Sequence, residues 1–248
     1  MHLLPTAYCL KMPEVTAKVQ TSDPRRRPQP EEGPVDIVYE DDWMLVANKP
    51  PGVVVHPTYK NTSGTLLNAV LWRVRDRPDA QPGILTRLDK DTSGLVVIAL
   101  TPDVHRIMQK DAAAGAMSKH YLALVRGSPQ PSRGHIILPL ARDPNDRRRV
   151  IVNPHGAACE TRYEIVSGNH GLSMVLCELV TGRTHQIRVH LAASGWPILG
   201  DRVYGEPDVS MPRQALHAWR VTLHHPVTRQ PLTFEAPLPD DMTRAAGI

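Results

Sequence analysis

The residues best suited to chemistry lie in two polar loops that are far apart in the chain. Asp89 stands between Leu88 and Lys90 in a loop that runs into the apolar segment 94–100. Arg183 lies in a second loop, just before a segment that can form a short helix. A carboxylate near a desolvated strand edge needs a positive partner to stay ionised, and a fixed guanidinium can provide it. The two loops together predict one active site, with Arg183 as the best candidate for the partner of Asp89.

Each of these residues also has a simpler interpretation. A loop carboxylate is usually a cap or a turn former, a role that suits Asp91 in the same loop. Arg183 is equally consistent with a phosphate or surface contact. Tyr121 is predicted to lie in a strand, where a half-buried tyrosine with its hydroxyl in water is common. In a chain with one Phe and only 4% aromatic residues, its ring could also stack on a planar ligand.

No pattern in the sequence indicates a metal or a cofactor. His185 and His190 are five positions apart and His224 is adjacent to His225, but neither pair has a third ligand at a suitable spacing. We interpret these four residues as hydrogen-bonded or exposed histidines. The chain lacks a glycine loop of the type that cradles phosphates, and it lacks a dinucleotide fingerprint. We therefore expect a reaction that needs no cofactor.

Many short strands and few helices must position the two loops. The strands are predicted at 35–39, 44–48, 94–100, 121–125, 161–166, 172–180, 216–223 and 232–235. Helices are predicted after the capping residues Thr62 or Ser63, from Thr101 to about Met117, and from Thr184 to Gly195. Because the two element types follow no regular alternation, the pattern indicates an α+β domain.

Composition divides the chain into a tail and one folded domain. Residues 1–34 hold six prolines and the run Arg25–Arg27 without an apolar period, so they are predicted to be a flexible tail, with the folded domain at 35–248. The formal net charge of +4 suggests a polyanionic partner. Three widely spaced cysteines and the lack of a long apolar run or a signal peptide predict a cytoplasmic protein with reduced thiols and no membrane contact.

Several segments resemble one known family in both order and spacing. The Arg-Leu-Asp-Lys-Asp-Thr-Ser-Gly motif is the most specific of them. The matching segments are 46–52, 87–94, 119–127, 181–191, 195–201, 214–218, 225–226 and 236–239. Over roughly residues 35–242 the chain is similar to the RluA-type pseudouridine synthases.

This resemblance implies an isomerase that converts uridine in RNA into pseudouridine. The implied fold has a mostly antiparallel mixed sheet in two halves, flanked by helices and loops, with a central catalytic cleft. Asp89 would be the catalytic aspartate, acting by attack on C1′ or by removal of the 2′ proton. Tyr121 would pack on the uracil and help to remove the C5 proton, and Arg183 would pair with Asp89. Arg87 would fill the gap that the flipped base leaves.

The chain departs from the family pattern at two positions. Thr86 replaces the usual His before Arg-Leu-Asp, and Ala157 replaces the usual Lys after Gly156. The first 34 residues are too short and proline-rich for the small RNA-binding domain that many relatives carry at the N-terminus. Segment 142–149 resembles the subgroup that acts on large-subunit rRNA.

We therefore expect a monomer that acts on structured rRNA or tRNA. Two other functions stay open. An RNA-binding protein that has kept the fold without the chemistry would not need an intact Asp89, Tyr121 and Arg183. A nucleosidase or glycosidase would need a second acid to protonate its leaving group, and Asp91 is the only acid near Asp89 in the sequence.

Overall fold

The computed structural model describes residues 28–58, 61–146, 148–169 and 171–247. Most of the predicted tail, residues 1–27, lies outside this range. Residues 28–34, also assigned to the tail, contact helix α1 (Leu66–Arg73). The amide of Glu31 donates to the carbonyl of Asn68 over 3.1 Å, and Asn68 Nδ2 donates to the carbonyl of Gln29 over 2.7 Å. The described part of the predicted tail therefore already contacts the folded domain.

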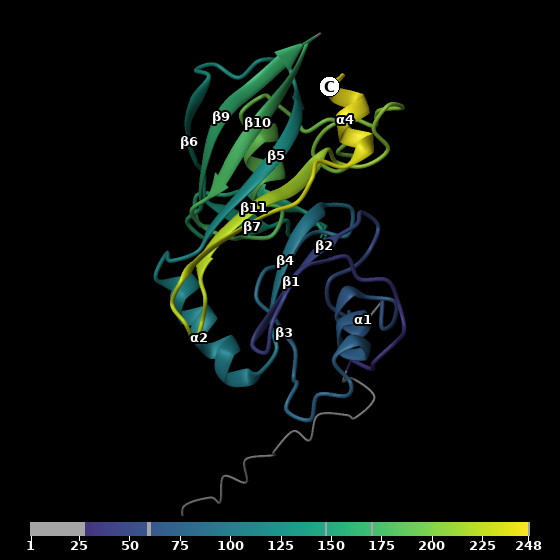
Figure 1. Cartoon of the computed structure of the whole chain (residues 1–248). Coiled ribbons are helices and arrows are strands. Elements are labelled where there is room, and N and C mark those ends of the chain that lie inside the picture. The colour runs from purple at the N-terminus through teal and green to yellow at the C-terminus, as the bar shows by residue number, and fades with distance from the viewer. Residues whose placement is uncertain (1–27, 59–60, 147, 170, 248) are drawn as a thin grey trace, which may run out of the picture.

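One ten-stranded sheet forms the framework of the molecule (Figure 1). Its main path runs β1-β2-β4-β11-β5-β10-β9-β6, with β3 on β4 and β12 on β11. The strands are β1 (Ile37–Glu40), β2 (Met44–Lys49), β3 (Gly83–Ile84), β4 (Ser93–Ala99), β5 (Ser118–Arg126), β6 (Arg133–Ile137), β9 (Glu160–Asn169), β10 (Leu172–Leu179), β11 (Leu216–His224) and β12 (Pro231–Glu235). A separate two-stranded hairpin consists of β7 (Leu140–Arg142) and β8 (Val150–Val152).

The sheet has two halves that meet at a single parallel strand pair. β4 and β11 pair over only two positions, His217 with Ser93 and Ala218 with Gly94, whereas the other strand pairs are antiparallel. Gly94 has a φ of +109°, and a Cβ at this position would overlap the carbonyl group of Ala218. A residue without a side chain is therefore required where the two halves join. The predicted α+β class with a mostly antiparallel mixed sheet is confirmed.

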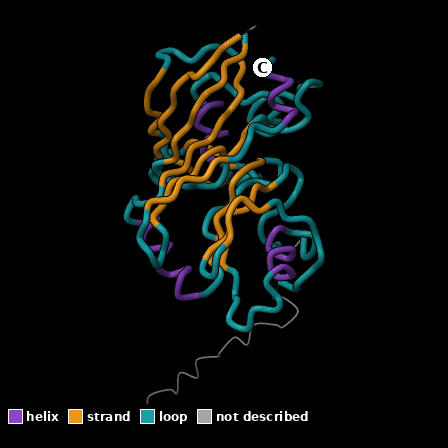
Figure 2. The backbone as a smooth tube through the Cα atoms, in the orientation of Figure 1, coloured by secondary structure: helices purple, strands orange, loops and turns teal. Residues whose placement is uncertain are grey.

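Helices cover both faces of the first half of the sheet (Figure 2). Every residue of its strand β4 is buried. Alternate residues of a strand point to opposite faces. Val96 and Ile98 pack with Leu66 and Val70 of α1 on one face. On the other face, Leu95, Val97 and Ala99 pack with Val104 and Met108 of α2 (Pro102–Ala113). This is the arrangement that a nearly all-apolar strand predicts.

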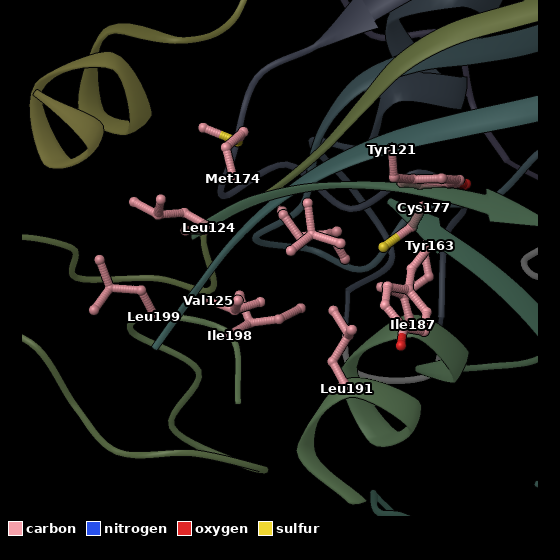
Figure 3. Close-up of a cluster of buried hydrophobic side chains, with 14 of the residues drawn as sticks. Tyr121, Leu124, Val125, Tyr163, Met174, Cys177, Ile187, Leu191, Ile198 and Leu199 are labelled. Carbon is pink, nitrogen blue, oxygen red and sulfur yellow. The ribbon is translucent and has the colours of Figure 1, made fainter. Parts of the chain in front are cut away.

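The second half has its own core between β5, β10 and helix α3 (Gln186–Ala193) (Figure 3). Ile187 and Leu191, one turn apart on α3, pack into this core as their spacing predicts. Helix α4 (Asp240–Ala246) adds Met242, which is fully buried. Cys177 lies in the same cluster as a reduced thiol.

The predicted helix starts are confirmed in one case and shifted in the others. Thr101 caps α2, with Pro102 at the first helical position. The cap of α1 is Thr65, which forms a capping box with Asn68, so the prediction of Thr62 or Ser63 is wrong. The cap of α3 is His185 in a left-handed conformation, one residue after the predicted cap Thr184, and the helix begins at Gln186. None of the helices in the described ranges has the length and apolar character needed to traverse a bilayer.

Candidate active site

A cleft with a volume of about 870 Å³ lies between the two halves of the sheet. One wall is formed by segment 82–89, which leads from β3 into the Asp89 loop, and by residues 54–58. The other wall is formed by Lys119 and Tyr121 of β5 and by segment 182–188, which leads into α3. The two loops that the sequence pairs therefore face one common space, which confirms the prediction of a central cleft.

The charged side chains that line this cleft are mostly cationic. Asp89 is the only carboxylate among the described lining residues. The cations that share the cleft with it are Arg87, Lys119, Arg142, Arg183 and Arg188. A concave surface with this excess of positive charge concentrates polyanions through its electrostatic field.

Hydrogen bonds from the β2 turn hold the Asp89 loop in place. The carbonyl of Lys90 accepts from the amide of Gly52 and from Nζ of Lys49, each over 2.9 Å. Nζ of Lys49 also donates to the carbonyls of Pro50 and Val53 over 2.8 Å. Burial lowers the pKa of Lys49 to about 7, whereas three carbonyl acceptors match the three donors of its ammonium form. This fully buried lysine therefore fastens the loop to the end of β2.

The next residue of the loop is fastened by a side chain from the segment before β11. Arg213 Nη1 donates to the carbonyl of Asp91 over 3.0 Å. The guanidinium is itself held by Asp241 of α4 through two hydrogen bonds of 2.7 and 2.8 Å. Thr92 closes the loop, because its amide donates to the carbonyl of Asp89 over 3.1 Å. The backbone around Asp89 therefore has a fixed position before any ligand binds.

Thr86, which replaces the family's usual histidine, has a structural task of its own. Its hydroxyl oxygen accepts from the amide of Val97 in β4 over 2.9 Å, just after β3 stops pairing with that strand. The carbonyl of Val97 accepts from the amide of Leu85 over 2.9 Å. The side chain of Thr86 therefore continues the hydrogen bonds between β3 and β4, and it fixes the point at which the chain leaves the edge of β4 to form the Asp89 loop.

The ion-pair partner of Asp89 is Arg188. Nη1 of Arg188 donates to Oδ2 of Asp89 over 2.8 Å. The other edge of the guanidinium donates to Asp201 through Nε at 2.7 Å and Nη2 at 2.8 Å. The side chains of Arg188 and Asp201 are only 6% and 1% exposed. Burial alone would lower the pKa of Arg188, but the two carboxylates outweigh it and hold that pKa above its ordinary value.

The prediction that Arg183 pairs with Asp89 is therefore wrong. Arg183 lies in the exposed loop before α3, whereas Arg188 is on the buried side of the helix. Among the described residues, the guanidinium of Arg183 has no ion-pair partner, although it lines the same cleft. Both arginines occur in one motif, and spacing alone does not choose between them. The signal that could have chosen is Asp201, a buried acid that requires a cation.

Tyr121 lies in the cleft wall with little of its surface exposed. It belongs to the same hydrophobic cluster as Ile187 and Leu216, which also line the cleft. Burial, followed by the negative charge of Asp89, raises the pKa of Tyr121 well above its ordinary value. The ring is therefore a flat, uncharged surface beside the carboxylate. Arg87, by contrast, is exposed at the edge of the cleft.

Sequence reasoning missed a histidine and a tyrosine beside Asp89. Nε2 of His185 is 3.7 Å from Oδ2 of Asp89, and its Nδ1 lies 2.8 Å from the hydroxyl of Tyr204. That hydroxyl also accepts from the amide of Val150 over 2.8 Å. The guanidinium of Arg188 lies over the Tyr204 ring at 5.1 Å. Burial lowers the pKa of His185, which favours a neutral ring at this point.

The other predicted histidine roles can also be placed. His190 is fully buried, with its ring nitrogens 2.9 Å from Thr161 Oγ1 and 3.0 Å from the carbonyl of Leu138. His225 is hydrogen-bonded to Asp41 over 2.7 Å, and His224 is exposed. Their interpretation as hydrogen-bonded or exposed side chains is confirmed. Within the described ranges, no three His, Cys, Asp or Glu side chains are grouped so that they could hold a metal ion.

Solved structures define the class of this fold. The human RNA pseudouridylate synthase domain containing 4 superposes with a TM-score of 0.70 at 22% identity, over 85% of this chain and 91% of that one. The human RNA pseudouridylate synthase domain containing 1 has a TM-score of 0.66 at 27% identity, over 84% and 86% of the two chains. The sheet of two halves with a cleft between them is therefore a pseudouridine synthase fold.

Sequence comparison then gives the family. A sequence model described as RNA pseudouridylate synthase matches residues 43–193. The ribosomal large subunit pseudouridine synthase D of Nitrosomonas europaea is 42% identical over 86% of this chain and 65% of that protein. The protein of the same name from Zymomonas mobilis is 37% identical over 86% of this chain and 72% of that protein. The chain belongs to the RNA pseudouridylate synthase family, a family of isomerases that act on uridine in RNA.

Proposed function

We propose that this protein isomerises specific uridines in structured rRNA to pseudouridine, with Asp89 as the catalytic carboxylate. The observation that carries this proposal is one ion-paired carboxylate in a cleft otherwise lined by cations. The cations suit an RNA backbone, and the carboxylate suits chemistry at the sugar. Two relatives named for the ribosomal large subunit favour rRNA over tRNA as the substrate.

The reaction conserves every atom of the uridine. The bond between N1 and C1′ breaks, the uracil turns, and C5 bonds to C1′. The proton on C5 is lost and N1 gains one. Attack of Asp89 on C1′ and removal of the 2′ proton by Asp89 both require an ionised carboxylate. Arg188 donates a hydrogen bond to this carboxylate and fixes its position in the cleft.

The remaining cleft residues receive roles that match their exposure. We assign the buried ring of Tyr121 to packing against the uracil, because its raised pKa keeps the phenol protonated. The exposed Arg87 is suited to fill the gap left by the flipped base, which offsets part of the few kcal/mol of lost stacking. The exposed Arg183 is suited to a phosphate contact instead of the carboxylate contact that the sequence suggests.

The deciding experiment measures base conversion and base release together. Protein-free large-subunit rRNA from cells that lack this gene is incubated with the purified protein, and pseudouridine is detected by carbodiimide labelling. We expect site-specific conversion by the unaltered protein and by Asp91→Asn, and none by Asp89→Asn, which should still bind RNA. Free uracil would identify a nucleosidase. RNA binding without any conversion would identify a binding protein.

We further propose that the protein acts as a monomer in the cytoplasm and needs no cofactor. The cleft supports this proposal, because both of its walls and the pair of Asp89 and Arg188 come from one chain. Sedimentation of the purified protein should give the mass of one chain in the absence of RNA. With RNA present, it should give the mass of the RNA plus one chain. A dimer at working concentrations would contradict the first part of the proposal, and conversion that ceases after dialysis against a chelator would contradict the last.

A further inference from the structure

Among the described cations of the cleft, Lys119 is the one that is partly shielded from water and yet has no negatively charged partner. It lies on β5, two residues before Tyr121, so both side chains point to the same face of the strand. Both also line the cleft. Lys119 is only half exposed, whereas Arg87, Arg142 and Arg183 are exposed to water.

The ammonium group of Lys119 has no hydrogen-bond or ion-pair partner among the described residues. Arg188, the other shielded cation of the cleft, is paired with two carboxylates. A cation that is withdrawn from water without a partner costs free energy. Burial accordingly lowers the pKa of Lys119. The missing partner is an anion, and the cleft is the space from which it can come.

A glycine in the same wall lies beside this ammonium. A Cβ on Gly182 would lie 3.4 Å from Nζ of Lys119, so the end of the lysine side chain lies against the backbone of Gly182. Gly182 is itself exposed and immediately precedes Arg183. The ammonium therefore lies toward the mouth of the cleft, whereas the buried Tyr121 lies deeper.

We propose that Lys119 binds a backbone phosphate of the RNA beside the flipped uridine while the base packs on Tyr121. This inference rests on the proposed function, and it adds a residue that holds the strand at the point of flipping. A phosphate fits better than a uracil carbonyl, because it carries the charge that the site lacks and because Nζ lies next to the exposed Gly182. Lys119 would thus be a positioning residue, with no part in bond making.

The test compares Lys119→Gln and Lys119→Arg with the control Lys110→Gln, an exposed lysine of α2 outside the cleft lining. Binding to protein-free large-subunit rRNA is measured between 50 and 200 mM salt, which are chosen conditions of about the range in which phosphate contacts are sensitive. We expect Lys119→Gln to weaken binding roughly tenfold. Its slope of log K against log salt should fall by about 0.7 to 0.9, the value for one phosphate. Lys119→Arg and Lys110→Gln should keep the original slope.

Two further measurements separate this role from a structural one. Removal of an unpaired, half-buried charge should leave the Tm of Lys119→Gln unchanged or higher, with kcat at saturating RNA within about threefold of the original. An unchanged salt slope would overturn the proposal, whether it comes with a lower Tm or with a lower kcat. If the unaltered protein forms no pseudouridine but Lys119→Gln still loses the slope, the proposed function fails and the phosphate site stands.

Discussion

Arg188 divides one guanidinium between a carboxylate in the cleft and a carboxylate in the core. Asp201 takes the two donors of one edge, and Asp89 takes the donor that faces the cleft. Asp201 also accepts from the amides of Val203 and Tyr204 over 2.9 and 3.2 Å. Burial raises the pKa of Asp201, but Arg188 outweighs that effect and holds the pKa below its ordinary value. The direction in which Arg188 points is therefore set by the core.

Replacement of Arg188 should therefore affect stability and activity together. Arg188→Met leaves Asp201 charged and almost fully buried, which should lower the free energy of unfolding by about 3–5 kcal/mol. Arg183→Met, at an exposed position of the same motif, should change it by less than about 0.5 kcal/mol. Urea unfolding of both variants checks this. Equal losses in the two variants would contradict the assignment of Arg188 as the buried partner.

The sequence predicted the residues of this site better than their pairing. Asp89 and Tyr121 lie in the cleft as expected, because Asp89 comes just before β4 and Tyr121 lies within β5, and apolar patterns set the positions of both strands. The pairing depended on which arginine of the second motif turns inward. That choice is made by Asp201 and by the start of α3 at Gln186, and neither contact is local in sequence.

At the scale of elements, β11 holds the centre of the sheet through a buried histidine. Nδ1 of His217 lies 2.9 Å from the hydroxyl of Ser93 in β4, and Nε2 lies 3.2 Å from the carbonyl of Ala236 after β12. Burial lowers the pKa of His217 to about 4. The ring is therefore neutral at pH 7 and joins three segments of the sheet.

His217 should make the free energy of unfolding fall as the pH is lowered. Below about pH 6.5 the unfolded chain binds a proton at His217, whereas the folded chain does so only near pH 4. Stability is therefore fully present above pH 6.5 and falls by up to about 3 kcal/mol as the pH drops to 4. Urea unfolding of the unaltered protein and His217→Gln at several pH values should show a weaker pH dependence in the variant. Parallel curves would contradict this.

The β7–β8 hairpin was not predicted, because its strands are three residues long and its connection is rich in Asp and Arg. It nevertheless brings Arg142 into the cleft lining and places the guanidinium of Arg149 5.7 Å from the centre of the Tyr204 ring. The hairpin therefore extends the cationic surface beyond the loops that hold Asp89 and Arg183.

Loss of hairpin charge should weaken RNA binding in proportion to the phosphates contacted. Arg142→Ala should lower the salt slope of RNA affinity by about 0.7 to 0.9. Arg106→Ala, at an exposed position on α2 beside Asp103, serves as the control and should leave the slope unchanged. Filter binding at several salt concentrations measures both. A slope unaltered in Arg142→Ala would show that RNA does not reach the hairpin.

At the scale of the whole molecule, the cleft depends on the short contact between β4 and β11. Most of the strands could be predicted from apolar patterns, and their residues form the three main cores. The junction could not, because parallel pairing of residues more than a hundred positions apart leaves no local pattern. In the sequence, only Gly94 hints at the junction. The need for a glycine there is clear only from the structure, in which the backbone of Ala218 leaves no room for a side chain.

A methyl group at this junction should separate the two halves. Gly94→Ala adds backbone strain at a φ of +109° and an overlap with Ala218, so we expect a loss of more than about 3 kcal/mol in the free energy of unfolding. Gly52→Ala is the matched control, because φ is +85° but the space around it is open, and it should cost about 1 kcal/mol. Thermal and urea unfolding test the pair. Similar losses in both would mean that strain alone matters at Gly94.

The position of β11 also bears on when the protein can become active during its synthesis. This strand is made after β4 and β5, yet it lies between them in the sheet and pairs with both. A nascent chain that ends before residue 216 can build each early strand pair but has nothing to bridge them. The cleft between the two halves can therefore be completed only after residues 216–224 have been made.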